Sequence, residues 1–489
     1  MISIKKTFAE RNKWINYRAS AIFPCYINDK NDQVISFQNY WFWKRRLTKL
    51  KFFITLIDEK TKISKKKKLK IKDHNEFSIK NIFNLKNFKG IIHCEVKSTK
   101  NLRFAFPGIV CFFINTTGLL SCVHSSGRIL NNNEKDKNHK HEESNFYCRL
   151  NSKFEPFFHL FRGNKIVKNN SKINISGFNY KNEKIFEFNH LINLKKPYSS
   201  KIFFISKITP RNIINKIKNK EFFLVIRYEE KNIFGRLVAG NYDKENDAIF
   251  ATHTLNVYDK KNNKDFVLPS EDKNSTTFLP LMSDKNLNLR TVIYPINQKF
   301  NINFFNKIVN QQNKKLKPSK EINKISSGPT GEVFLKKIKD RKFNLLYSNK
   351  KVPGRIYVSH NYSFKNSRHP TDIGTAFHNS HMPPKKNHWG QSVSKKNYKT
   401  MLLIRNVSHN IGKTNDAKCN LECFNNSLKL EKNFSIAGDS FKILNLEKIL
   451  KKIKSNFFSW RLSSNSGNLE VIWLSYNNRN RSVCGDHSF

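Results

Sequence analysis

Apolar and polar residues alternate along this chain in short runs that have the length of β-strands. Segments 222–228, 290–296, 400–407 and 469–476 are rich in β-branched and aromatic residues. Clusters of Asn, Gly, Asp and Lys bound these segments, and such clusters are typical of turns. Many short strands at close spacing favour β-sandwich structure.

Helical periodicity is confined to two stretches. In 445–457, apolar residues stand at the i, i+3, i+4 and i+7 positions counted from Leu446, which is the spacing of one helix face. In 210–222, Thr209 and Pro210 occupy the positions of an N-cap and a first helical residue. Because each stretch precedes an apolar run, we expect a short helix before the strand.

A hairpin-like pattern recurs four times: an opening Gly, an apolar run with an Asn near its end, a polar turn and a closing His. The copies occupy 108–124, 235–253, 354–378 and 467–487, and their asparagines are Asn115, Asn241, Asn361 and Asn477. The glycines lie about 113 to 127 residues apart, and a near-constant period marks an architecture of repeated units. We therefore expect the four glycines, and the four histidines, to occupy equivalent positions.

The repeat predicts four domains of ordinary size. We place them at 1–129, 130–256, 257–382 and 383–489, with a His-rich loop in the third. The predicted fold class is all-β: four tandem, diverged, antiparallel β-sandwich-like units with one or two short helices. Polar stretches beginning at 131, 258 and 382 have too little apolar content for burial, so we expect loops or linkers there.

The net charge of +53 has more than one explanation. Lys far outnumbers Arg, although Arg is favoured for bidentate contacts with bases and phosphates. The Lys excess accompanies abundant Asn, Ile and Phe, a combination that AT-rich codons produce, and outside 65–72 it is scattered. We therefore expect no specific nucleic-acid partner, and nonspecific attraction to nucleic acid, an anionic membrane or an anionic polymer is the alternative.

The cysteines and the N-terminal segment bear on the compartment. Most of the eight Cys lie in apolar runs, where a thiol behaves as a small buried hydrophobe. In an extended segment Cys419 and Cys423 are too far apart for a disulfide, and no second Cys pair completes a zinc site. The first 20 residues lack a signal-peptide core, and no apolar window is long enough to span a membrane. We expect a cytoplasmic protein with reduced thiols.

Common catalytic signatures are absent from the sequence: it has no P-loop, dinucleotide fingerprint, nucleophile elbow, HExxH or kinase motif. One dense group of polar ligands stands in the third unit. The candidate metal ligands are His360, His369, Asp372, His378 and His381. First-row metals favour imidazole and carboxylate, so a divalent transition metal is the cofactor this group would bind. A solvated polar loop, or a pH sensor, is the other explanation.

The histidines that close the hairpins also have two explanations. Each His would cap backbone groups at the end of its strand. Alternatively, the units pack around a shared axis and bring His124, His253, His378 and His487 together. On that second explanation, His124, His253 and His487 are candidate ligand-binding residues.

Aromatic side chains supply another candidate binding surface. Trp389 follows His388 in a polar stretch, where we expect an exposed ring that can stack on a sugar. Both residues are therefore candidate ligand-binding residues. Trp460 and Trp473 lie in predicted strands, and we expect them in the core.

Two classes of function, and a minor third, fit these features. We predict a non-catalytic binding or assembly protein whose tandem sandwiches bind a glycan, a surface polymer or another protein. The first alternative is a metal- or His-dependent enzyme acting on carbohydrate and centred on the 360–388 loop. The second is a nonspecific nucleic-acid binder with a Lys-rich surface. The glycan prediction rests on analogy at the level of fold, and whether the chain is an enzyme stays open.

Overall fold

The computed structural model describes most of the chain from residue 15 onward. The described residues are 15–61, 63–103, 107–124, 127–129, 131, 143–164, 166, 171–181, 183–228, 233–234, 237–254, 256–257, 266–267, 277–284, 286–294, 300–309, 317–327, 334–338, 342–348, 352–353, 358–364, 366–375, 385–408, 412–453, 455–477 and 479–489. The chain divides into two compact units, one of residues 1–179 and 184–259, the other of 180–183 and 260–489. Each unit contains two sets of eight strands, and we call each set a repeat.

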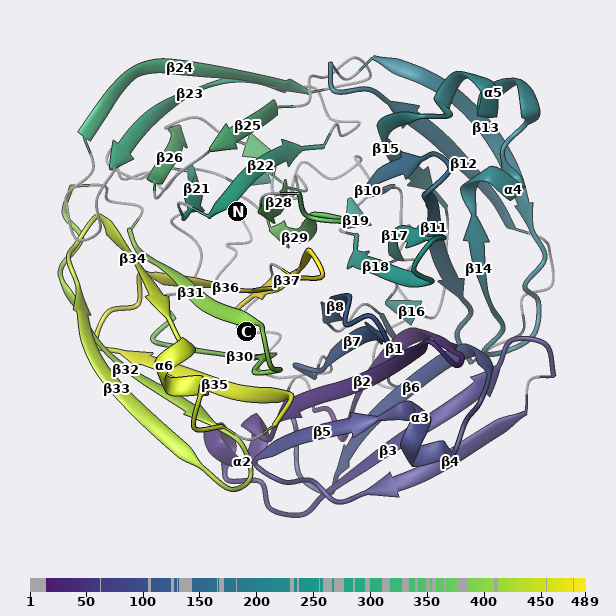
Figure 1. Ribbon diagram of the computed structural model, residues 1–489, viewed down its shortest axis with the longest axis horizontal. Helices are drawn as coiled ribbons and strands as arrows, with labels where there is room; N and C mark the ends of the chain where they lie inside the picture. The colour runs from purple at the N-terminus through teal and green to yellow at the C-terminus, as the bar shows by residue number, and fades with distance from the viewer. Residues whose placement is uncertain are drawn as a thin grey trace. The chain divides into compact units, whose positions relative to one another are not determined.

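The first repeat consists of two four-stranded antiparallel sheets (Figure 1). Its strands are Arg18–Ile27 (β1), Asn31–Gln38 (β2), Leu50–Asp58 (β3), Ser64–Leu69 (β4), His74–Ser78 (β5), Phe88–Ser98 (β6), Val110–Asn115 (β7) and Leu120–His124 (β8). One sheet has the order β1-β6-β3-β4 and the other the order β5-β2-β7-β8.

The second repeat completes the first compact unit. Its strands are Glu143–Leu150 (β10), Phe154–Phe161 (β11), Ser171–Phe178 (β12), Lys184–Ile192 (β13), Ser200–Phe204 (β14), Lys220–Arg227 (β15), Val238–Asp243 (β17) and Ala248–His253 (β18). They form the sheets β13-β12-β15-β10 and β14-β11-β17-β18, and Asn256–Val257 (β19) extends the former beside β10.

The third and fourth repeats make up the second compact unit. The third has Thr277–Ser283 (β21), Leu287–Ile293 (β22), Phe300–Val309 (β23), Lys317–Ser327 (β24), Phe334–Ile338 (β25), Lys342–Ser348 (β26), Val358–Phe364 (β28) and Thr371–Thr375 (β29). The fourth has Asn387–Val393 (β30), Lys399–Asn406 (β31), Ala417–Phe424 (β32), Lys429–Ile436 (β33), Ser440–Asn445 (β34), Phe457–Ser464 (β35), Leu469–Asn477 (β36) and Ser482–His487 (β37). Their sheets are β21-β26-β23-β24 and β25-β22-β28-β29, then β30-β35-β32-β33 and β34-β31-β36-β37.

All four repeats share one topology. Numbered from one to eight within a repeat, the strands always form one sheet in the order 1-6-3-4 and another in the order 5-2-7-8. Identical strand order in four successive segments confirms the all-β prediction of tandem, diverged sandwich-like units. The four domain boundaries drawn from the sequence stay a prediction.

The register of the hairpin made by strands seven and eight supports the equivalence of the closing histidines. His124 pairs with Val110, His253 with Val238 and His487 with Ile472, in each case near the start of strand seven. His378 lies outside the described residues. The opening glycines match less well, because Gly108 stands two residues before Val110 whereas Gly467 stands five before Ile472.

The asparagine alignment needs two corrections. Asn361 lies inside β28, three residues before that strand ends at Phe364. Asn115 and Asn477 each end strand seven, and their side chains accept hydrogen bonds from turn N–H groups two or four residues on. In the second repeat Asp243 fills this position and accepts from Glu245 N at 3.1 Å. Asn241 lies two residues earlier and instead bonds to the backbone of β10. Sequence similarity alone could not separate these positions, since Asn and Asp cap turns equally well.

Five short helices occur in the described part of the chain, more than the two expected. They are Tyr40–Arg45 (α2), Ile79–Phe83 (α3), Ile205–Ile208 (α4), Arg211–Ile217 (α5) and Glu447–Leu450 (α6). Both predicted helices exist, although α5 has Pro210 rather than Thr209 as N-cap. α6 is short because the chain continues past Leu450 in tighter three-residue hydrogen bonds, which still bury Ile453.

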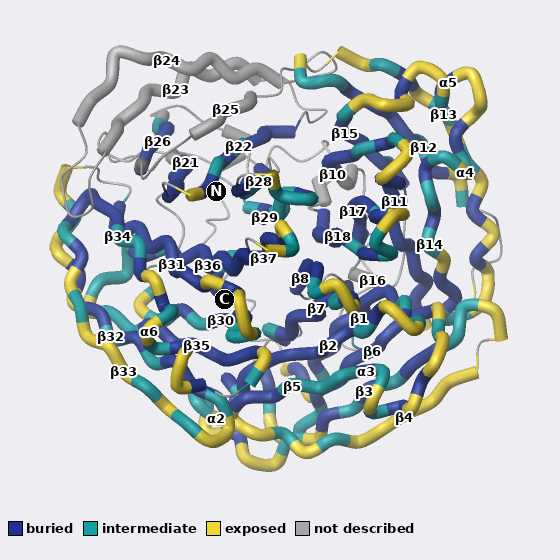
Figure 2. The backbone as a smooth tube through the Cα atoms, viewed as in Figure 1, coloured by how far each residue is buried: buried dark blue, intermediate teal, exposed yellow. Residues whose placement is uncertain are grey.

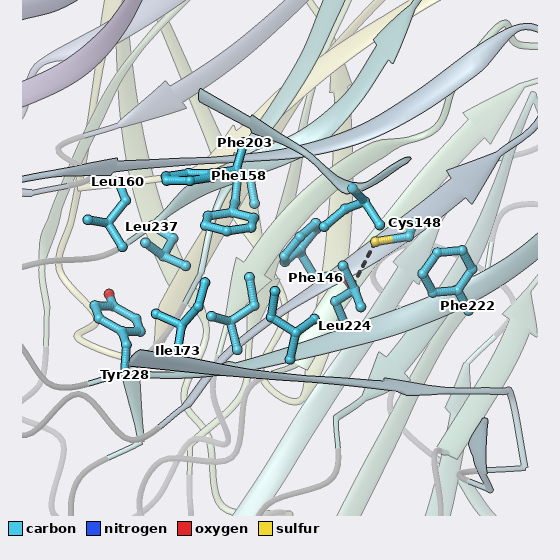
Figure 3. Close-up of a cluster of buried hydrophobic side chains, with 14 of the residues drawn as sticks. Phe146, Cys148, Phe158, Leu160, Ile173, Phe203, Phe222, Leu224, Tyr228 and Leu237 are labelled. Carbon is cyan, nitrogen blue, oxygen red and sulfur yellow. Dashed lines mark hydrogen bonds between the residues drawn. The ribbon is translucent and has the colours of Figure 1, made fainter. Parts of the chain in front are cut away.

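Each repeat is a sandwich with a core between its sheets, as the second repeat illustrates (Figure 3). Phe158 of β11 and Phe203 of β14 stack with ring centroids 5.0 Å apart, and Phe146 of the facing sheet joins the same cluster. In the fourth repeat Trp460 and Trp473 are fully buried, as expected. All eight cysteines are buried free thiols, which confirms their packing role.

The 65–72 lysine run has a structural explanation. It includes β4, an edge strand that is exposed along its length (Figure 2). Charged side chains on an edge strand oppose pairing with other chains, so Lys residues protect this edge from aggregation. The second and fourth repeats have edge strands at the same place, β13 and β33, in which most residues are exposed or half-buried. Among the described residues, no helix has the length and apolar character needed to cross a membrane.

Two pairs of two-residue strands complete the described strands. They are Arg128–Ile129 (β9), which pairs with Ile233–Phe234 (β16), and Phe266–Val267 (β20), which pairs with Val352–Pro353 (β27). β9 and β16 belong to the first compact unit and link its two repeats by a short ladder.

Candidate functional site

Two of the closing histidines meet inside the first compact unit. His124 ends β8 of the first repeat and His253 ends β18 of the second. Their Nε2 atoms lie 3.0 Å apart, and their rings are nearly perpendicular, at 80°. Both side chains are buried, with 6% and 4% of their surface exposed. A contact this short requires at least one of the two rings to be neutral, since two imidazolium rings have no acceptor.

Bonds between the repeats hold this histidine pair in place. Ser121 Oγ donates to Ile249 O at 2.5 Å and accepts from Ala251 N at 3.1 Å, which joins β8 directly to β18. At the far end of the hairpins, Asn115 Nδ2 donates to Asn246 O at 2.9 Å. The pair therefore sits on two hairpins that are fixed to each other at both ends.

The remaining closing histidines belong to the second compact unit. His487 is partly buried, and its Nδ1 lies 2.9 Å from Ser488 O. His378 lies outside the described residues. Convergence of histidines from all four repeats stays a prediction.

The predicted metal ligands of the third repeat do not form one ligand set where the structure describes them. His360 pairs with Ile373, and Asp372 pairs with the neighbouring Asn361, so His360 and Asp372 face opposite sides of the sheet. His360 Nδ1 lies 2.9 Å from Thr291 Oγ1, while Asp372 accepts a short hydrogen bond from Ser359 Oγ. The structure therefore does not bring these two side chains together, and metal binding by the predicted set stays a prediction.

His369 is also engaged locally. Its side chain is 3% exposed, and its Nδ1 lies 2.6 Å from Pro370 O. His381, like His378, is outside the described residues. Residues 366–375 therefore form a turn followed by strand β29, with His369 buried, and not a solvated polar loop.

His388 and Trp389 were expected in a polar loop, and they lie in strand β30. His388 is buried, with Nδ1 2.8 Å from Ser488 Oγ and Nε2 3.2 Å from Lys385 O. Burial lowers the pKa of His388 well below its ordinary value, so the ring is neutral and structural. Trp389 is partly buried and exchanges backbone hydrogen bonds with Phe489. Strand pairing overrode the polar composition of this stretch, so the pair makes a poor sugar platform.

A basic cavity of about 950 Å³, which the sequence analysis did not predict, opens on the fourth repeat. Its lining includes the turn between β30 and β31, helix α6 and the two residues that precede strand β35. Five cationic side chains stand around it, against one carboxylate. They are Lys395, Lys396, Lys399, Lys451 and Arg479, with Glu447 as the acid. The volume lies in the range of small-molecule and cofactor sites.

The cavity wall is built rigidly. Ser394 N donates to Asn456 O at 2.9 Å, and Ser394 Oγ donates to Ser455 O at 2.6 Å, which ties the lysine-bearing turn to the opposite wall. Asn397 adopts φ 70°, a left-handed conformation that Asn tolerates in turns. Buried apolar side chains of Leu450 and Ile453 also line the cavity.

The electrostatics of the cavity favour an anion. Lys399 Nζ lies 3.7 Å from Glu447 Oε1, which partly neutralises one cation. Burial raises the pKa of Tyr398 to about 12, so its phenol stays uncharged and adds no negative charge. Lys395, Lys396 and Lys451 have no carboxylate partner among the described residues. The net field inside the cavity is therefore positive.

A second hollow, of about 590 Å³, lies on the β30-β35-β32-β33 sheet of the same repeat. Hydroxyl and amide side chains dominate its lining, together with the ring of Phe434. Asn420 Nδ2 donates to Asn433 Oδ1 at 2.8 Å across two strands, and Lys442 Nζ lies 5.4 Å from the Phe434 ring centroid. Amides, hydroxyls and an aromatic face suit the hydroxyls and apolar faces of sugars.

Comparisons with known proteins leave the site without a relative. No family model matches the chain, and no curated protein matches it. Among solved structures, the native conformation of the alpha-2-macroglobulin of E. coli aligns with 96% of this chain at 7% identity. The alignment covers 28% of that protein and has a TM-score of 0.10, at which a likeness carries no argument about fold or function.

The sequence contained a faint signal for the basic cavity. A Lys pair at 395–396 and another at 451–452 flank apolar segments in the last unit. Nothing in their spacing, about 55 residues, shows that one cavity includes Lys from both, because only the pairing of β30 with β35 brings these segments together.

Proposed function

We propose that this protein is a non-catalytic binding protein whose fourth repeat binds an acidic glycan in the basic cavity. The observation that carries the proposal is the excess of four positive charges around a cavity with a partly apolar lining. Cationic clefts raise the local concentration of anionic ligands, and the effect weakens as salt is added.

Several features favour a carboxylated or sulfated sugar over nucleic acid. Four of the five cations are Lys, whereas Arg is preferred for bidentate phosphate recognition. The apolar lining suits the apolar face of a pyranose, and the second hollow offers amides and hydroxyls on the same repeat. Tandem copies of one sandwich are also a common way to present a binding surface. A protein partner and a cytoplasmic location stay predictions.

The test uses the full-length chain and a set of defined polymers. Binding of polygalacturonate, dextran sulfate, neutral dextran and single-stranded DNA is measured by calorimetry at 0.05 and 0.2 M salt. The cavity variant carries Lys395→Gln, Lys396→Gln and Lys451→Gln. Each exposed cation contributes roughly 0.2–1 kcal/mol, so the triple variant should bind an acidic glycan roughly 3- to 150-fold more weakly.

A matched control separates cavity binding from general charge. Lys65→Gln, Lys68→Gln and Lys70→Gln remove the same charge from the exposed 65–72 run, and should leave glycan affinity within about twofold. Equal losses in both variants would show that the affinity comes from net charge and not from the cavity. Tighter binding of DNA than of either acidic glycan would favour the nucleic-acid alternative instead.

A further inference from the structure

His124 and His253 place two buried imidazole rings in contact at the junction of the first and second repeats. A single hydrogen bond between neutral rings explains the 3.0 Å contact. Two imidazole nitrogens are also half of the ligands that a tetrahedral metal ion needs. Neither residue lines the basic cavity of the fourth repeat, so the role of this histidine pair is independent of glycan binding.

We infer that His124 and His253 bind a divalent transition-metal ion through their Nε2 atoms. Two Zn–N bonds of about 2.0–2.1 Å at a tetrahedral angle place the nitrogens about 3.3 Å apart. The observed separation of 3.0 Å needs a widening of only about 0.3 Å, which a side-chain rotation supplies. Imidazole is a favoured ligand of Zn²⁺, Cu²⁺ and Ni²⁺.

Metal binding by this pair needs only a change of tautomer in one ring and no other reactant. In the metal-free pair, one ring carries its proton on Nε2 and donates it to the other ring. When the ion enters, that ring takes the tautomer with the proton on Nδ1, so both Nε2 lone pairs are available and no net proton is released. Water or further donors complete the coordination.

The scaffold is suited to this role because the ligands are preorganised. The two hairpins are joined through Ser121 to Ile249 and Ala251, so the imidazoles are held together before an ion arrives. Preorganised ligands lose little conformational entropy on binding. A metal at this position would bind the two repeats of the first compact unit to each other, in addition to their hydrogen bonds.

The experiment titrates the full-length, metal-stripped protein with Co²⁺ and records the visible absorption that histidine nitrogens confer. Native mass spectrometry measures the number of Zn²⁺ ions bound per chain. We expect one tight ion in the wild type, and affinity at least about tenfold weaker in His124→Ala and in His253→Ala. The control is His93→Ala, which removes another buried histidine of the same unit and should bind as the wild type does.

The alternatives give distinct results. An ion that survives both histidine variants but is lost in the double variant His378→Ala, His381→Ala would place the metal in the 360–388 loop and overturn the inference. Absence of Co²⁺ absorption in the folded wild type would also overturn it, and the pair would then be a structural hydrogen bond. Because the wild-type titration needs no substitution, a variant that fails to fold leaves the inference testable. Loss of glycan binding affects none of these outcomes.

Discussion

Asp247 is the residue whose removal should most clearly separate the first two repeats. It lies in the turn between β17 and β18 and joins the second repeat to the first. Its carboxylate accepts from Tyr242 Oη at 2.6 Å, from Asn28 Nδ2 at 2.7 Å and from Tyr26 Oη at 3.3 Å. Burial, followed by the hydrogen bond to Asp247, raises the pKa of Tyr242, so the phenol keeps the proton that it donates.

The expected cost of Asp247→Ala follows from these three bonds. A hydrogen bond to a charged group contributes about 1.5–3 kcal/mol, but Asp247 is partly exposed and the Tyr26 bond is long. We therefore expect a loss of about 2–4 kcal/mol in the free energy of unfolding of the first compact unit. For a unit of this size that corresponds to a fall in Tm of roughly 5–15 °C.

Two further substitutions separate hydrogen bonding from backbone strain. Asp247 has φ 52°, which Ala adopts at a cost of about 1 kcal/mol and Gly adopts freely. Asp247→Gly should therefore lose the bonds without that strain. Asp247→Asn keeps the shape and can accept from Asn28 while its amide donates to the tyrosine hydroxyls, so it should cost less than either.

Calorimetry of the full-length protein measures the unfolding transition of each variant, and urea titration followed by circular dichroism checks the free energies. A double-mutant cycle of Asp247→Ala with Asn28→Ala should show a coupling of about 0.5–3 kcal/mol. If Asp247→Ala unfolds within about 0.5 kcal/mol of the wild type, the carboxylate does not join the repeats, and the account of the junction is wrong.

Two other predictions concern buried positions. Gly390→Ala should destabilise the fourth repeat by about 1–3 kcal/mol in urea unfolding, because the added methyl would lie 2.6 Å from Cζ2 of Trp460. In a protein that also carries Trp460→Phe, the smaller ring should reduce this cost. An equal cost of Gly390→Ala with Trp and with Phe at position 460 would contradict the clash. Burial lowers the pKa of His159 to about 3, below the ordinary value of about 6.5 in the unfolded chain. The neutral ring contributes fully to stability above pH 6.5, and this contribution is lost as the pH falls from there towards 3. Between pH 7.5 and 5 the free energy of unfolding should therefore fall by about 2 kcal/mol more in the wild type than in His159→Gln. Identical pH profiles of the two proteins would refute this.

Much of the fold followed from the sequence, because the signals for it are local. Strand propensity, turn residues and the repeated hairpin sufficed for an all-β chain of tandem sandwiches, since each signal acts within about ten residues. The burial of Trp460, Trp473 and the cysteines followed in the same way from apolar runs. Local rules also explain the two predicted helices, although not the three others, which are only four to six residues long and too short for a periodic pattern to stand out.

Tertiary structure decided the candidate sites, because each depends on register between distant strands. His124 and His253 are 129 residues apart, and only the packing of β8 on β18 brings their Nε2 atoms to 3.0 Å. A shift of one residue in the pairing of β28 with β29 would have placed His360 and Asp372 on one face, yet the actual register separates them. His388 and Trp389 became part of a strand because pairing with β35 satisfied their backbone groups, whatever the polarity of the stretch. The basic cavity likewise exists only because the turn at 394–398 is hydrogen-bonded to 455–456, a contact that no local pattern encodes.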